Sequence, residues 1–193
     1  MVKDIAEKIG EMIKENMKNL NEKEVNDLIE NIVKSKNIFI VGAGRSGLVG
    51  KAFAMRLMHL GFNVYVVGET ITPAINPEDL LIAISGSGET TFTVGAVKTA
   101  KKIGVRVVGI TSYENSEMGK LCEKIVKIPG REVIKKSPDY FSSQLTGNYQ
   151  PLTPLGSLFE LSTMVFLDSV IAKLMRKLNK KEDYLRKRHT NLQ

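Results

Sequence analysis

The feature that most limits the fold of this 193-residue chain is a regular alternation of short apolar runs with longer stretches of helical periodicity. Five apolar runs rich in Val and Ile are predicted strands; they cover residues 37–41, 63–67, 80–84, 105–111 and 124–128. Strands that are apolar on both faces are typical of a parallel sheet buried between helices. The alternation therefore predicts an α/β fold, a single doubly wound domain whose five-stranded parallel sheet is flanked by helices.

Apolar residues at helical spacing predict the elements between and around these strands. The predicted helices cover residues 3–18, 22–33, 46–60, 91–102, 116–122 and 155–179, and a short last one begins at residue 181. Asn21 is a favourable N-cap with Glu24 in the third helical position, and Gly61 is a favourable C-cap.

The order of the predicted elements gives the domain organisation. We expect residues 1–35 to form an N-terminal helical extension of the main domain, residues 36–193, which also carries the C-terminal helices. Residues 130–154 are irregular and rich in Ser, Pro, Gly and Asn, and they are long enough to be a functional loop.

Composition excludes several classes of protein. The apolar runs are strand-length, whereas a membrane span needs about 20 apolar residues, and the N-terminus lacks the apolar core and cleavage site of a signal peptide. We therefore expect a cytoplasmic protein that has no membrane partner. The single cysteine, Cys122, and two histidines leave too few side chains for a Cys or His metal site, so we predict no metal and no cofactor.

The formal net charge of +7 raises the question of a nucleic-acid partner. Most of the excess lies between Lys173 and His189, where eight Lys and Arg residues accompany two acidic ones. This basic tail has little aromatic interleaving, and the chain has no zinc-finger spacing and no RNA-recognition signature. We predict that the tail is a solvated helical face or helps to bind an anionic small molecule, and that nucleic acid is not a partner.

Two glycine-rich turns follow predicted strands and lead into predicted helices. In open α/β sheets, ligands bind beyond the carboxyl ends of the strands, where glycine lets backbone amides close on an oxyanion and a helix N-terminus adds partial positive charge. Hydroxyl groups in both turns can donate to phosphate oxygens. The predicted phosphate-binding residues are Gly44, Arg45 and Ser46 in the first turn and Ser85, Gly86, Ser87, Gly88, Glu89 and Thr90 in the second.

A nucleotide is the alternative ligand for these turns. Gly42, Gly44 and Gly47 match Gly-x-Gly-x-x-Gly, but this motif is weak by itself, and the expected acidic residue is only loosely matched by Glu69. Neither turn has the Lys-Ser/Thr of a P-loop, and a dinucleotide fold does not explain the second turn. A tight strand–helix connection without a ligand is the remaining alternative for each turn.

The sequence resembles the sugar isomerase (SIS) domain family. Gly42-Ala-Gly-Arg-Ser after the first strand and Ser85-Gly-Ser-Gly-Glu-Thr after the third carry the resemblance to the whole family. Three further segments resemble its 6-phospho-3-hexuloisomerase group: Phe53-Ala-Met-Arg-Leu-Met-His-Leu-Gly-Phe, Pro154-Leu-Gly-Ser-Leu-Phe-Glu and Arg188-His-Thr-Asn-Leu. Gly156-Ser157 stands where family members often have Gly-Thr, a change that keeps the hydroxyl.

The resemblance implies an aldose/ketose-type isomerase that interconverts D-arabino-hex-3-ulose 6-phosphate and fructose 6-phosphate through an enediol, in the ribulose monophosphate pathway. It also implies a phosphorylated sugar as partner and self-association into a homotetramer. Two alternatives stay open: another SIS sugar-phosphate isomerase, of the arabinose 5-phosphate type, and a non-catalytic sugar-phosphate-binding protein. Sensors of the second kind usually carry a helix-turn-helix, for which residues 1–35 are too short.

Glu160 is the predicted general base. It is the only acidic side chain between Asp139 and Asp168, and it lies in the first turns of an otherwise apolar predicted helix. Desolvation in such a setting raises the pKa of a carboxyl group, which suits proton abstraction near neutral pH. An acid stabilised by the helix dipole is the alternative, and the family resemblance places the enediol-forming glutamate at this position.

The two histidines are candidates for a second acid–base group. His59 lies 13 residues after Ser46 on the same predicted helix, about 20 Å along its axis, so it cannot reach the turn of its own chain. It either caps its helix or serves a neighbouring subunit. His189 lies in the basic tail and is the preferred catalytic partner of Glu160. The alternative is that it belongs to a disordered terminus. The apolar excess of the terminal helices also predicts a homo-oligomer, most simply a tetramer, with shared sites.

Overall fold

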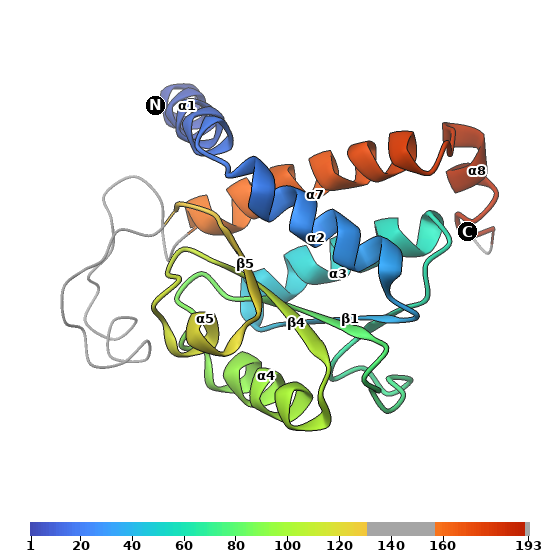
Figure 1. The fold of residues 1–193 in the computed structure, drawn as a ribbon. Coiled ribbons are helices and arrows are strands. Elements are labelled where there is room, and N and C mark those ends of the chain that lie inside the picture. Colours follow the sequence, from blue (N-terminus) through green and yellow to red (C-terminus); the bar gives the residue numbers. More distant parts are fainter. Residues whose placement is uncertain (131–156, 192–193) are drawn as a thin grey trace.

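The computed structural model describes residues 1–130 and 157–191 of the chain. In these residues five strands pair in parallel into one sheet with the order β2-β1-β3-β4-β5, which confirms the predicted α/β fold (Figure 1). The strands are β1 (Ile38–Gly42), β2 (Val64–Val66), β3 (Leu80–Ile84), β4 (Arg106–Thr111) and β5 (Lys124–Lys127). The predicted strand 63–67 is the shortest of them, because β2 lies at an edge and pairs with β1 alone.

Helices cover both faces of the sheet (Figure 1). One face carries α2 (Glu22–Lys34), α3 (Gly44–His59) and α7 (Ser157–Lys177); the other carries α4 (Thr91–Ile103) and α5 (Glu117–Leu121). α8 (Glu182–Arg186) lies beside the C-terminal end of α3, and α1 (Val2–Lys18) contacts α7 and projects away from the sheet. No helix within the described ranges is long and apolar enough to cross a bilayer.

The alternation of side chains along the strands explains why the domain has two cores. Ile38 and Ile40 of β1 point into the core beneath α2, α3 and α7, whereas Phe39 and Val41 point into the core beneath α4 and α5. All four are at most 1% exposed. Because successive residues of a strand face opposite sides, a strand with this composition is stable only when helices cover both of its faces.

α3 packs unusually close to β1. A Cβ atom built on Gly47 would lie 2.8 Å from the carbonyl oxygen of Gly42, and one built on Gly50 would lie 2.9 Å from Cγ2 of Ile40. Neither position has room for a side chain. The first turns of α3 are therefore held directly against the strand that precedes them.

The order of the strands reverses in the middle of the sheet, between β1 and β3. From β1 the chain moves to β2 on one side and then returns to β3 on the other side of β1. Such a switch point leaves a crevice beyond the carboxyl ends of the two central strands, where open α/β sheets bind ligands. Both glycine-rich turns follow these two strands.

The predicted helix caps are confirmed, with one difference. Oδ1 of Asn21 accepts from the backbone N–H groups of Lys23 and Glu24, at 3.0 and 3.4 Å. The Glu24 carboxylate does not turn back to its own helix but accepts from the backbone N–H of Lys127 in β5, at 2.9 Å. Gly61 follows α3 with a left-handed φ of 89°, as a C-cap glycine does.

The two helices of the predicted N-terminal extension differ in burial. α2 places Leu28 and Ile32, both fully buried, in the core beneath α7. α1 has no buried residue, although Ile9, Ile13 and Met17 form a half-buried apolar stripe along it. α2 is thus part of the domain core, and α1 is an outer element.

Cys122 should be unreactive in the folded protein. Burial raises the pKa of its thiol to about 12, so the nucleophilic thiolate is scarce at neutral or mildly alkaline pH. We expect iodoacetamide to alkylate the native protein far more slowly than the protein unfolded in guanidinium chloride, as measured by mass spectrometry over time. Equal rates in the two states would contradict this prediction.

Candidate functional site

The two glycine-rich turns meet at the carboxyl edge of the sheet. Gly42 at the end of β1 is paired in register with Ile84 at the end of β3, so the turns begin side by side. The first turn leads into α3 at Gly44, and the second leads into α4 at Thr91. Two helix N-termini with unpaired backbone N–H groups therefore converge on one crevice, an arrangement suited to an anion.

The second turn is closed by its own hydroxyl groups. Oγ of Ser85 lies 2.9 Å from Oγ1 of Thr90 and accepts from the backbone N–H of Gly88 at 3.1 Å. Ser85 is buried, whereas Ser87 and Thr90 are half-buried. The Ser85 hydroxyl thus shapes the turn, and the hydroxyls of Ser87 and Thr90 are the ones better placed to meet a ligand.

Neighbouring elements hold this turn from outside. The backbone N–H of Ser112 donates to the carbonyl of Gly86 at 3.2 Å. The Glu89 carboxylate, predicted to contact the ligand, accepts from the backbone N–H of Glu117 at the start of α5, at 2.8 Å. Ser112 is not among the residues predicted from the sequence. The signal that could have found it is the pair of hydroxyl residues Thr111-Ser112, which follows β4 at its carboxyl end as the glycine-rich turns follow β1 and β3.

Glu160 lies in the first turn of α7 and touches the first turn of α3. Its Oε1 accepts from Oγ of Ser46 at 3.4 Å, and its Oε2 lies 3.8 Å from Nε of Arg45. The Glu160 side chain is 13% exposed and that of Arg45 is 54% exposed. A shielded carboxylate therefore sits beside a cation that faces solvent, and the fold supplies a counter-charge that the sequence around Glu160 lacks.

The helix that carries Glu160 also contacts the second turn. A Cβ atom built on Gly86 would lie 2.9 Å from Cδ1 of Phe159, the residue before Glu160. Phe159 is 1% exposed. The predicted base and both predicted phosphate turns are thus brought together by direct contacts, the turn of α3 through Ser46 and the turn of α4 through Gly86.

Comparison with known proteins gives the family of this chain. The SIS domain family matches residues 31–148. The chain belongs to the SIS domain family. It is 40% identical to a 3-hexulose-6-phosphate isomerase of Bacillus subtilis over 90% of this chain and 89% of that one. It is 42% identical to the one from Methanocaldococcus jannaschii over 87% and 83%.

A solved structure gives the same result for the fold. A crystal structure from Methanococcus jannaschii, from which a function of 3-hexulose-6-phosphate isomerase was inferred, superposes on this SIS domain with a TM-score of 0.78. The two chains are 38% identical, and the match covers 98% of each. The predicted resemblance to this group of the SIS family is therefore confirmed over nearly the whole chain.

The two histidines of this SIS domain lie together, far from Glu160. The ring centroids of His59 and His189 are 5.2 Å apart, at the C-terminal end of α3. Ser46 lies at the opposite end of α3, about 20 Å away along the helix axis, and Glu160 of α7 contacts it there. Within one chain, the structure does not bring His189 to the predicted base.

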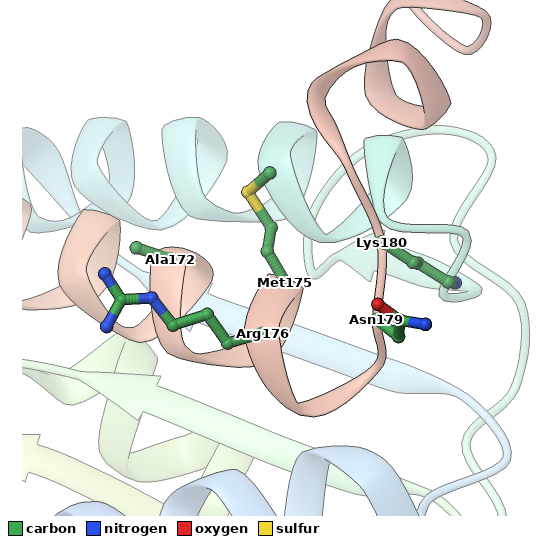
Figure 2. A pocket seen from close by; sticks show the side chains of 5 residues that line it. All are labelled: Ala172, Met175, Arg176, Asn179 and Lys180. Carbon is green, nitrogen blue, oxygen red and sulfur yellow. The ribbon is translucent and has the colours of Figure 1, made fainter.

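A hollow lies near the same distant end. It is lined by Ala172, Met175, Arg176, Asn179 and Lys180, and Figure 2 shows the Met175 side chain pointing toward α3. The Lys180 ammonium contacts the carbonyl of Leu60 and lies 3.3 Å from the hydroxyl of Tyr184. Through these contacts Lys180, in the basic tail, holds α8 beside the end of α3. The hollow is separate from the Glu160 site.

Two further predictions concern metal binding and the loop of residues 130–154. Across residues 1–130 and 157–191, no three His, Cys, Asp or Glu side chains are grouped so that they could hold a metal ion. The predicted functional loop, residues 130–154, lies outside the described residues except for Gly130.

His59 should make stability depend on pH. Its side chain is 3% exposed, and burial, His189 and Arg56, in that order, hold the pKa of His59 below its usual value. As the pH falls, the His59 side chain therefore takes up a proton in the unfolded chain before it does so in the folded chain. The contribution of neutral, buried His59 to the free energy of unfolding is fully present above about pH 6.5 and is lost progressively below it.

The measurement is guanidinium unfolding of the wild type and of His59→Phe between about pH 5 and about pH 8. One such group changes the free energy of unfolding by at most about 1.4 kcal/mol per pH unit. We expect a smaller slope for His59→Phe. Comparison of slopes removes the constant packing effect of the substitution, and identical slopes would contradict the assignment.

Proposed function

We propose that this SIS domain interconverts D-arabino-hex-3-ulose 6-phosphate and fructose 6-phosphate, the reaction of a 3-hexulose-6-phosphate isomerase. The observation that carries the proposal is the contact of Glu160 with Arg45 and Ser46 beside two turns suited to phosphate. The similarity to isomerases of this name over most of the chain supports the choice of substrate.

The phosphate of the substrate is assigned to the two turns. In the proposal, backbone N–H groups at the starts of α3 and α4 and the hydroxyls of Ser87 and Thr90 bind the phosphate oxygens. Gly44 allows close approach of the backbone, whereas Gly86 and Gly88 make room for Phe159 and Ser116, and Ser85 and Glu89 hold the second turn in shape. Binding far from the reacting carbons orients the sugar and lowers the barrier.

Glu160 is the proposed base. It removes the proton from C2 of the hex-3-ulose, and the electrons of that bond form a C2–C3 double bond while the π electrons of the C3 carbonyl move to its oxygen. That oxygen takes a proton from the second acid–base group, which gives a cis-enediol. The proton on Glu160 then returns to C3 while the C2 hydroxyl gives its proton to the second acid–base group, so the carbonyl passes from C3 to C2. Substrate and product have the same atoms and the same overall oxidation state, so no external oxidant or reductant takes part.

Arg45 is suited to assist this step. Its guanidinium is half-exposed and lies 3.8 Å from Glu160, so it can face both the carboxylate and a bound sugar. A cation at this place stabilises negative charge that develops on the enediol oxygens. Arg45 therefore remains a proposed substrate-binding residue, placed toward the reacting end of the sugar by its contact with Glu160.

His189 is the proposed second acid–base group, supplied by a neighbouring subunit, with His59 beside it at the shared site. The separation of His189 from Glu160 within one chain and the exposed apolar face of α3 both support this arrangement. Leu48, Met55 and Met58 on this face are 66, 44 and 41% exposed. We propose a homotetramer on these grounds.

The remaining assignments follow from this activity. We propose that the enzyme acts in the cytoplasm, in the ribulose monophosphate pathway, with no nucleic-acid or membrane partner. The basic tail, from Lys173 to His189, would attract the anionic substrate to a shared site. Residues 1–35 are proposed as a helical extension in which α1 is the outer part and α2 packs into the core, and residues 36–193 as the SIS domain with its C-terminal helices.

Replacement of Glu160 tests the activity and the base together. Glu160→Gln should lower kcat about 10²- to 10⁴-fold with little change in KM, because the amide cannot accept the C2 proton. The assay couples fructose 6-phosphate formation to its oxidation, with arabinose 5-phosphate as the competing substrate. The control is Asp168→Asn, an exposed acid on the same helix. A loss of kcat below about tenfold would remove Glu160 from the mechanism.

A mixing experiment tests the shared site. Chains with His189→Ala and chains with Glu160→Gln should each be nearly inactive, yet mixed oligomers should recover activity, because some hybrid sites contain both intact groups. Light scattering gives the oligomeric state of each sample. A monomeric active wild type, a fully active His189→Ala variant, or mixtures without recovery would each contradict the shared site.

A further inference from the structure

Asn16 of the outer helix α1 makes two hydrogen bonds to distant parts of the chain. Its side-chain Nδ2 donates to the carbonyl oxygen of Pro129 at 2.8 Å and to Oγ of Ser162 at 2.9 Å. A side-chain amide has two N–H donors, so both are used. α1 has no buried residue, which makes these bonds a specific connection between an otherwise peripheral helix and the domain.

Both acceptors adjoin the turn of α7 that carries Glu160. Ser162 follows Glu160 by two residues and is fully buried. Pro129 precedes Gly130, and a Cβ atom built on Gly130 would lie 2.6 Å from both N and Cα of Phe159. The segment after β5 therefore presses directly on the backbone next to Glu160, and Asn16 joins that segment to α7.

The same turn of α7 is fixed on another side by the phosphate turn. Gly86 leaves space for the Phe159 ring, with 2.9 Å between its built Cβ and Cδ1 of the ring. Phe159 is thus enclosed by two glycines, one on each segment, and Ser162 is bonded to α1. These contacts restrain the position from which the Glu160 carboxylate reaches Ser46.

We propose that Asn16 is a positioning residue for Glu160, so that the N-terminal helix sets the geometry of the base. The inference rests on the proposed function, in which Glu160 abstracts the proton. Proton transfer depends on the placement of the base to within about 1 Å, and a displacement of this size can cost about 10²-fold in rate. α1 contributes through α7 and does not contact the substrate.

The test compares Asn16→Asp with Asn19→Ala. Asn16→Asp keeps the size of the side chain but removes both donors and places a carboxylate oxygen against the Pro129 carbonyl oxygen, which cannot donate, whereas the Ser162 hydroxyl can turn to donate to the other oxygen. Asn19 is the C-cap residue directly after α1, and in the described structure its side chain bonds only to Glu15 of that helix. We expect Asn16→Asp to lower kcat about tenfold or more, with KM changed less than about twofold, and Asn19→Ala to match the wild type.

A double-mutant cycle separates positioning from a general loss of stability. Ser162→Ala removes one acceptor of Asn16 without touching the predicted site. If the bond acts on Glu160, the loss of kcat in the double variant is smaller than the product of the two single losses.

Asn16→Gln, which restores the donors on a longer side chain, should recover part of kcat. Independent, multiplicative losses would overturn the proposal.

Melting temperature and light scattering complete the comparison. An Asn16→Asp variant that keeps the wild-type assembly and melting temperature but loses kcat supports positioning. Loss of activity only in step with unfolding or dissociation overturns it, and if Asn16→Asp does not fold, Ser162→Ala provides the same kcat-against-KM test. An active wild type with a fully active Asn16→Asp refutes this inference alone, whereas a wild type without isomerase activity refutes the proposed function itself.

Discussion

The pairing of β1 with β3 is the constraint on which the rest of the structure depends. Because Gly42 stands opposite Ile84, the two strands end together, and the two glycine-rich turns start from the same edge of the sheet. The reversal of strand order at this point leaves the edge open between helices. The starts of α3 and α4 follow from that register, and the start of α7 contacts both turns.

Much of the fold could be predicted from local sequence. Strands buried on both faces are short apolar runs, and β3 was predicted at Leu80–Ile84, its observed bounds. Capping residues such as Asn21 and Gly61 act on their immediate neighbours, so their roles were also readable. Edge strand β2 was less well bounded, because it pairs on one side only and its three residues are half-buried.

The contacts that complete the candidate site could not be predicted in the same way. Arg45 and Glu160 are separated by more than a hundred residues, and only the packing of α3 beside α7 brings them together. Glu24 was recognised for its place in a helix, yet its carboxylate serves β5. The meeting of His59 with His189 likewise follows from the docking of α8 through Lys180, which periodicity does not encode.

The close approach of α3 to β1 has a consequence for how such a domain can change over evolutionary time. Any side chain at position 47 would force the start of α3 away from the Gly42 carbonyl, and Arg45 and Ser46 would move with it. The contacts of both residues with Glu160 would then lengthen. Under the proposed function, position 47 therefore limits the packing of α3 and the geometry of the base together, and a change of substrate would meet less resistance at other positions around the two turns.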